Sequence, residues 1–249
     1  MATIPLSPVQ AQEPEAPKAI AGAGHTIILC IVVAAWAIRS YMGMHKMAAD
    51  AHPHRVILYV TTTIWEWAVV GYIVWGVKRH GSTVRELIGG RWNGAEDFFK
   101  DVGIAAGFWF VSLFVLGGTA LALHANRRGD ELGSMLPQTG LESLLWVMTA
   151  VTAGICEEII FRGYFQKQLV AWTNNVSAGV LLTAIIFGSV HLYQGWKSAV
   201  VILVFGLLFG MLAEWRKSLR PGMMAHAWQD TIAGLLAPML LRALKNVPK

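Results

Sequence analysis

Residues 157–162 read Glu-Glu-Ile-Ile-Phe-Arg, and they lie within an otherwise apolar run that extends from about Leu144 to Leu169. A helix of this length can cross the roughly 30 Å hydrocarbon core of a lipid bilayer. A charged side chain at mid-bilayer costs about 2.5 to 3.5 kcal/mol on insertion scales, so three of them need a paired, packed or hydrated interior. The stretch therefore predicts a transmembrane helix that is held within a helical bundle.

The spacing within this run separates the two acids. Glu158 and Arg162 are four residues apart, so a helix places them on one face, in the order that favours an ion pair. Glu157 is rotated by about 100° from Glu158 around the helix axis and cannot fully share that geometry. We therefore expect Glu158 to pair with Arg162 and Glu157 to be left free.

The rest of the chain is similarly apolar. Of its 249 residues, 55% are hydrophobic and 14% are charged, against roughly 25% charged in an average soluble domain. The apolar runs predict an all-α, polytopic transmembrane bundle of about seven spans, within a range of six to eight. The stretch Ser82–Lys100 is too polar to cross and is predicted to lie at the interface as an amphipathic segment. The predicted spans are Ile20–Ile38, Val56–Trp75, Val102–His124, Leu144–Leu169, Val176–Leu192, Trp196–Ala213 and Met223–Leu241.

The basic residues indicate contact with lipid. The net charge is +5, but the basic residues stand singly or in pairs between apolar runs, which favours anionic lipid headgroups over nucleic acid. They divide nearly evenly between the two sides of a seven-span bundle, so the orientation is left open. Cys30 and Cys156 both lie inside apolar runs and suggest no disulfide framework.

Two further runs bring ionisable groups to membrane depth. Phe187 and His191 are four residues apart in one of them, and His226 and Asp230 are four residues apart in the other. With the acids at 157–158, these residues match what water activation requires. A carboxylate removes a proton from water, an imidazole holds that water, and further donors or a cation neutralise the developing oxyanion.

Other residues fit this chemistry less well. Ser189 points away from His191 on its helix, and there is no G-x-S-x-G elbow. The H-E-x-x-H zinc signature is also absent from the sequence. Glu66 is the single acid of its run, and we expect it to be bonded to a partner or to face a cavity, with its role left open.

The charged motifs resemble a known family, the CPBP (CAAX protease and bacteriocin-processing, or Abi) intramembrane endopeptidases, which include the type 2 CAAX prenyl protease. The family motifs E-E-x-x-x-R, F-x-x-x-H and H-x-x-x-N/D occur here in order on separate runs. The resemblance covers roughly Gly140 to Leu241. It implies a catalytic core at 140–249. The apolar runs predict N-terminal transmembrane helices and the interfacial segment at 20–139, and the proline-containing polar composition of residues 1–19 predicts a disordered tail.

The resemblance also implies roles for the motif residues. Glu157 would activate the hydrolytic water, and His191 would hold that water and share its proton. His226 and Asp230 would stabilise the oxyanion. Glu158 and Arg162 would support the site.

The last motif position departs from the asparagine that the family often has there. An ionised aspartate can only accept hydrogen bonds, so Asp230 is expected either to orient a protonated His226 or to complete a metal site. Glu157, His191, His226 and Asp230 form a reasonable ligand set for zinc. We favour a metal-free glutamate mechanism because four protein ligands would leave no open position for water. The cofactor requirement is therefore left open.

His191 and His226 lie near opposite ends of their runs, so a simple seven-span count places them on opposite sides of the membrane. Either mechanism needs them together. We therefore predict that the connection Arg216–Gly222 dips into the bilayer, so that the last span starts below the surface.

These residues predict an intramembrane endopeptidase that acts on membrane-associated or lipid-anchored peptide or membrane-protein substrates. The expected location is an integral, multi-pass position in a bacterial inner or plasma membrane, and the oligomeric state is left open. The alternative is a transporter or an immunity-type binding protein that uses the same polar cavity. Glu66 on an independent span would favour that alternative.

Overall fold

The computed structural model describes residues 17–50, 53–125 and 130–245. The predicted tail therefore lies outside the described residues up to residue 16, as do the last four residues of the basic end. Every regular element in the described part of the chain is a helix, which confirms the all-α prediction. The elements are α1 (Ala23–Ala48), α2 (Arg55–Arg79), α3 (Val84–Ile88), α4 (Ala95–Ala122), α5 (Asp130–Met135), α6 (Gly140–Glu157), the π-helix η1 (Glu158–Gln166), α7 (Lys167–Thr173), α8 (Val176–Val190), the 3₁₀-helix η2 (Leu192–Gln194), α9 (Trp196–Arg216) and α10 (Arg220–Lys245).

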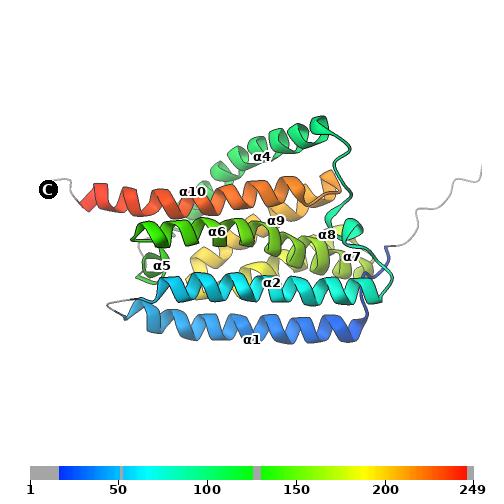
Figure 1. The fold of residues 1–249 in the computed structure, drawn as a ribbon, viewed down its shortest axis with the longest axis horizontal. Coiled ribbons are helices and arrows are strands. Elements are labelled where there is room, and N and C mark those ends of the chain that lie inside the picture. The colour runs from blue at the N-terminus through cyan, green and yellow to red at the C-terminus, as the bar shows by residue number, and fades with distance from the viewer. Residues whose placement is uncertain (1–16, 51–52, 126–129, 246–249) are drawn as a thin grey trace, which may run out of the picture.

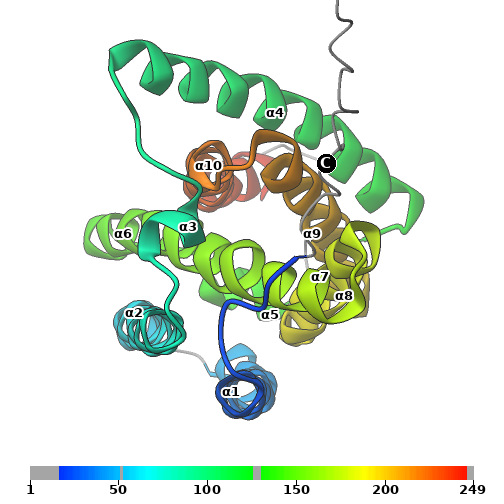
Figure 2. The same ribbon diagram turned by 90° about the vertical axis from the view of Figure 1, so that its right-hand side faces the viewer.

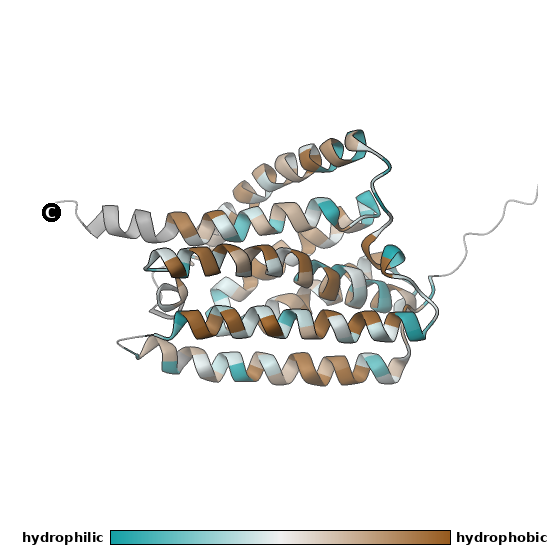
Figure 3. Ribbon diagram, viewed as in Figure 1, coloured by the Kyte–Doolittle hydropathy of each residue, from teal (hydrophilic) through white to brown (hydrophobic). Residues whose placement is uncertain are grey.

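The long helices lie side by side along the long axis of the molecule (Figure 1). The helix α6 packs against α2 and α10, and α8 packs against α9. The helix α4 inclines away from the others at its amino end and contacts α9 and α10 (Figures 1 and 2). Apolar residues dominate the middle of the long helices, whereas hydrophilic residues gather near many helix ends and connections (Figure 3).

In the part of the chain that the structure describes, five helical segments are long and apolar enough to cross a membrane. They are α1, α2, α4, the continuous rod Gly140–Thr173 and α9. The helices α8 and α10 occupy the two remaining predicted runs, so the exact count of seven spans stays a prediction. With 15 residues, α8 is about 22 Å long and falls short of the roughly 30 Å hydrocarbon core.

The predicted interfacial segment contains a short helix and the start of a long one. Thr83 caps α3 by accepting a hydrogen bond from the backbone N–H of Glu86, whose side chain accepts from the backbone N–H of Thr83. The helix α4 then begins at Ala95, seven residues before the predicted Val102, because its charged first turns continue the same helix. The position of Ser82–Lys100 at the membrane interface stays a prediction.

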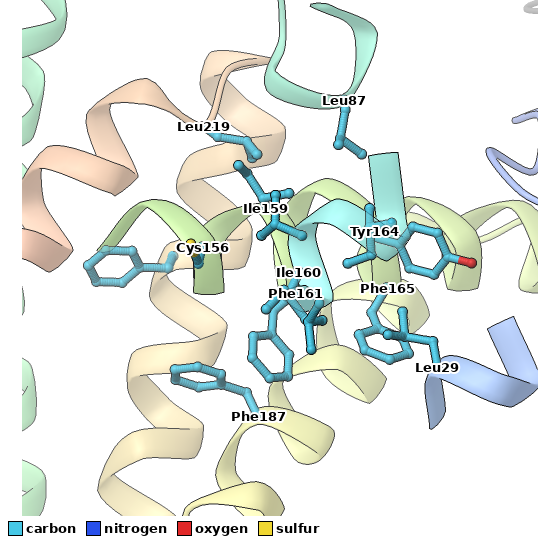
Figure 4. Close-up of a cluster of buried hydrophobic side chains, with 14 of the residues drawn as sticks. Leu29, Leu87, Cys156, Ile159, Ile160, Phe161, Tyr164, Phe165, Phe187 and Leu219 are labelled. Atoms are coloured by element: carbon cyan, nitrogen blue, oxygen red, sulfur yellow. The ribbon is translucent and has the colours of Figure 1, made fainter. Parts of the chain in front are cut away.

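The centre of the apolar core is the rod that contains the charged motif. Its residues Ile159, Phe161 and Phe165 pack with Leu29 of α1 and Phe187 of α8 (Figure 4). Half of the most apolar stretch of this rod is buried, against 11% in α1. The rod switches from α-helix to π-helix at Glu158, a local widening that often marks functional sites.

The connection between α9 and α10 is held by the segment before α4. The backbone N–H of Leu219 donates to the carbonyl of Ile88 at 2.9 Å. Gly89 has a φ of +91°, and a Cβ there would lie 2.2 Å from the carbonyl oxygen of Lys217, so only glycine fits. That the connection Arg216–Gly222 dips into the bilayer stays a prediction.

Candidate active site

The buried ion pair predicted from the spacing is formed. Arg162 Nη1 lies 2.9 Å from Glu158 Oε1, and both side chains are at most 1% exposed. The guanidinium also donates to the carbonyl of Gly206 at 3.4 Å and lies 4.5 Å from the ring centroid of Phe187. These contacts offset part of the cost of removing two charges from water.

His226 on α10 is held by the same carboxylate. Its Nδ1 lies 3.2 Å from Glu158 Oε1, and because a carboxylate accepts, Nδ1 carries the donated hydrogen. The other ring nitrogen, Nε2, lies 3.8 Å from Glu157 Oε2 and 3.5 Å from Asp230 Oδ2. One imidazole ring is thus surrounded by three carboxylates.

Close packing of α6 against α10 brings these groups together. A Cβ added at Gly154 would lie 2.7 Å from the backbone nitrogen of Ala227, so the absence of a side chain allows the two backbones to approach. Trp146 Nε1 donates to the backbone carbonyl of Asp230 at 2.9 Å. These contacts set the register that places His226 beside Glu157.

His191 reaches the same region from the end of α8. It is the C-cap residue of that helix, and its Nδ1–H donates to the carbonyl of Phe187 at 2.7 Å, which leaves Nε2 as an acceptor. The ring centroid of Phe187 lies 4.7 Å from that of His191 and 6.4 Å from that of His226. Phe187 on α8 thus lies beside both imidazoles, although a simple seven-span count places them on opposite sides of the membrane.

Exposure separates the supporting residues from those that a substrate could reach. The side chains of Glu158 and Arg162 are at most 1% exposed, and that of His226 is 4% exposed. The side chains of Glu157 and Asp230 are 18% and 38% exposed. The two carboxylates beside Nε2 of His226 therefore face the accessible side of the site.

Two residues without a predicted role belong to this region. Glu66 on α2 is buried, its Oε2 has no hydrogen-bond partner, and its charge interacts with those of Glu157, His226 and Asp230. The sequence signal for Glu66 was an isolated acid in an apolar run, which does not say which way the acid faces.

Tyr193, in η2, is the second of these residues. Burial raises the pKa of Tyr193, and the charges of Glu157, Asp230 and Glu66 act in the same direction, against a hydrogen bond from Gln194. Its hydroxyl therefore stays protonated and can donate. The sequence reasoning missed it because a tyrosine two residues after a histidine has no distinctive signature.

The four residues considered for zinc are not arranged as a ligand group. Among the described residues, no three or more His, Cys, Asp or Glu side chains are placed to hold a metal ion. We therefore derive no step of the chemistry through a metal.

Comparison with known proteins agrees with the motif resemblance. Residues 139–232 match the family described as type II CAAX prenyl endopeptidase Rce1-like, a protease family. The matched range contains all three motifs, whereas Glu66 lies outside it. No curated protein and no solved structure is significantly similar to the chain. Together with the five apolar helices, the match indicates an integral membrane protein. Over residues 139–232, the chain is therefore similar to the Rce1-like family of type II CAAX prenyl endopeptidases.

Proposed function

We propose that the chain is an intramembrane endopeptidase that hydrolyses a peptide bond in a membrane-associated or lipid-anchored substrate, with water activated by Glu157. The observation that carries this proposal is the convergence of α6, α8 and α10. With η1, which carries the buried ion pair, they bring the partly exposed carboxylate of Glu157 beside the imidazole of His226. The ring of Phe187 lies 4.7 Å from that of His191 and 6.4 Å from that of His226, between centroids. The family match supports the reaction class.

Glu157 is the best placed general base. Its carboxylate is more exposed than that of Glu158. Arg162 forms its ion pair with Glu158, so the carboxylate of Glu157 is available to act as a base. Its charge interacts with those of His191 and His226. A water between Glu157 and the Nε2 acceptor of His191 could donate one hydrogen to each, which orients its oxygen lone pair toward a substrate carbonyl.

The proposed reaction proceeds by addition and elimination. Glu157 takes a proton from the water as the water oxygen bonds to the carbonyl carbon, and the carbonyl π electrons move to the oxygen. The carboxylic acid of Glu157 then gives its proton to the amide nitrogen as the carbon–nitrogen bond breaks. A carboxylic acid and an amine are released, and Glu157 returns to its ionised form.

The oxyanion needs donors, and His226 can supply one. When its ring is protonated, Nε2–H can donate to the oxyanion. Glu158 accepts from Nδ1 and thereby holds the orientation of the ring, as buried carboxylates do for catalytic histidines. Asp230, at 3.5 Å from Nε2, favours the charged ring and does not itself donate when ionised.

The test is cleavage of a lipid-anchored peptide library by purified protein in liposomes. Glu157→Gln keeps the size of the side chain but removes the base, so we expect kcat to fall by about 10²- to 10⁴-fold. The thermal unfolding temperature should change little because Glu157 is partly exposed. Glu96→Gln, at an exposed position in the first turn of α4, is the matched control and should keep full activity.

Full activity of a folded Glu157→Gln protein would contradict the mechanism. Absence of cleavage in the unaltered protein, together with ion-gradient-dependent flux across the liposome, would instead support the transporter alternative. That alternative drew on Glu66 as an independent intramembrane acid. Because the charge of Glu66 interacts with those of Glu157 and Asp230, this argument no longer favours a separate pathway.

A further inference from the structure

Glu66 has a buried carboxylate oxygen that no protein donor satisfies. The residue is 6% exposed, and its Oε2 lacks a hydrogen-bond partner. A buried polar atom without a partner is destabilising, and more so when it is charged. A ligand that donates hydrogen bonds would offset this destabilisation, so the side chain is suited to bind one.

The packing of α2 against α6 turns Glu66 toward the site. Thr63 Oγ1 lies 3.3 Å from Thr149 Oγ1, which fixes the faces that the two helices present to each other. Glu66 is one turn beyond Thr63 on the same face of α2. Glu157 is eight residues beyond Thr149, which rotates it by about 80° around α6, toward His226 of α10. Glu66 therefore lies on the side on which α2 and α6 meet, and Glu157 lies at the edge of that side.

Hydrogen-bond acceptors outnumber hydrogen-bond donors around Glu66 and Glu157. Glu66, Glu157 and Asp230 come from α2, α6 and α10, and their charges interact with one another. Glu158 is excluded from this count because it is paired with Arg162. The facing donors are Nε2–H of the protonated His226 ring and the Tyr193 hydroxyl. The surplus of carboxylates favours a positively charged ligand.

We propose that Glu66 binds a cationic side chain of the substrate, a lysine ammonium or an arginine guanidinium, next to the scissile bond. This proposal rests on the proposed protease function and names its substrate preference. Glu66 is the direct partner of the cation, and the charges of Glu157 and Asp230 add to the local negative potential. Lysine and arginine suit a membrane site because their long apolar stems pack along hydrophobic surface while the charged end reaches a polar group.

The same potential acts on anionic groups. An acidic side chain at this substrate position would face three carboxylates, which disfavours its binding. The carboxylate produced by hydrolysis is repelled in the same way, which promotes its release.

The experiment uses lipid-anchored peptides in which lysine, norleucine or glutamate is moved through the positions around the scissile bond. Norleucine has nearly the shape of the lysine stem without the charge. At one position we expect kcat/KM to be at least about tenfold higher for lysine than for norleucine, and lowest for glutamate, since losing one partner of a buried charge pair is costly. Glu66→Gln should lower the ratio of kcat/KM for the lysine peptide to that for the norleucine peptide from at least about tenfold to about one. Glu66→Asp, which keeps the charge, should retain the preference, and Glu96→Gln should change neither peptide.

A second measurement separates this proposal from the protease function. Peptide binding to His191→Ala, with and without Glu66→Gln, is measured by fluorescence anisotropy in detergent, and folding is checked by thermal unfolding. If lysine peptides bind more tightly only when Glu66 is present but nothing is cleaved by the unaltered protein, the protease function fails and the cation site stands. If peptides are cleaved or bound without a preference for lysine, the cation site is wrong. It is also wrong if Glu66→Gln lowers the cleavage of the lysine peptide and of the norleucine peptide by the same factor.

Discussion

The rod Gly140–Thr173 and the helix α1 are both apolar enough to cross a membrane, yet they differ in what surrounds them. Half of the most apolar stretch of the rod is buried inside the protein, against 11% of that in α1. The helix α1 exposes isoleucines such as Ile27 and Ile31, which suits contact with lipid tails. The rod can carry charges because neighbouring helices supply their partners.

The buried polar residues of the rod illustrate this difference. Gln166 donates to the carbonyl of Gly210 and to Glu214. Gln168 accepts from the backbone N–H groups of Ile20 and Ala21 and so fastens the segment before α1. Hydropathy alone therefore does not distinguish a lipid-facing helix from a helix that organises a site; the partners do.

The largest expected effect on stability comes from breaking the buried ion pair. Arg162→Leu leaves the Glu158 carboxylate buried without its cation, so we expect the free energy of unfolding to fall by about 3–5 kcal/mol. This loss is measured by unfolding the protein in detergent with increasing dodecyl sulfate while tryptophan fluorescence is recorded. The double variant Glu158→Leu with Arg162→Leu removes both charges and should recover much of the loss. If Arg162→Leu alone costs less than 1 kcal/mol, the rod does not depend on internal pairing.

A smaller effect is expected where two backbones meet. Gly154→Ala would place a Cβ 2.7 Å from the nitrogen of Ala227, so α6 and α10 must separate, at a cost of about 1–3 kcal/mol. The gap between Glu157 and His226 would widen, and peptide cleavage should fall with it. The same unfolding assay, paired with the cleavage assay, reads out both effects.

Gly107→Ala is the matched control for this substitution on the exposed side of α4. No atom lies within 4 Å of a Cβ built there, so the gain in helix propensity should dominate and stabilise the helix by at most about 1 kcal/mol. Equal losses for the two alanine variants would show that tight packing between α6 and α10 does not set the site.

The smallest effect is expected at the exposed ion pair. Lys217 Nζ lies 2.8 Å from Glu214 Oε2, but the lysine side chain is 76% exposed. Lys217→Met should change the free energy of unfolding by about 0–1 kcal/mol, and added salt should shrink that change further because exposed charges are screened. A loss comparable to that of Arg162→Leu would remove the contrast between buried and exposed pairs.

Periodicity and spacing predicted much of this arrangement. Each predicted apolar run is occupied by a helix, and the four-residue spacing predicted the ion pair between Glu158 and Arg162, because both depend on local geometry. The early start of α4 was missed since charges in its first turns have the polarity of a surface segment. The π-helix was missed because its widened turns depend on how the rod packs.

The sequence by itself determined the helical class, the membrane character and the identity of the motif residues, because hydropathy and spacing act along the chain. The tertiary structure alone decided that Phe187 of α8 lies beside His226, that Glu158 contacts both Arg162 and His226, and that Glu66 is buried without a hydrogen-bond partner for its Oε2. Each of these depends on which helix faces lie against each other, and that choice is made by close packing between residues far apart in the chain, which no local pattern encodes.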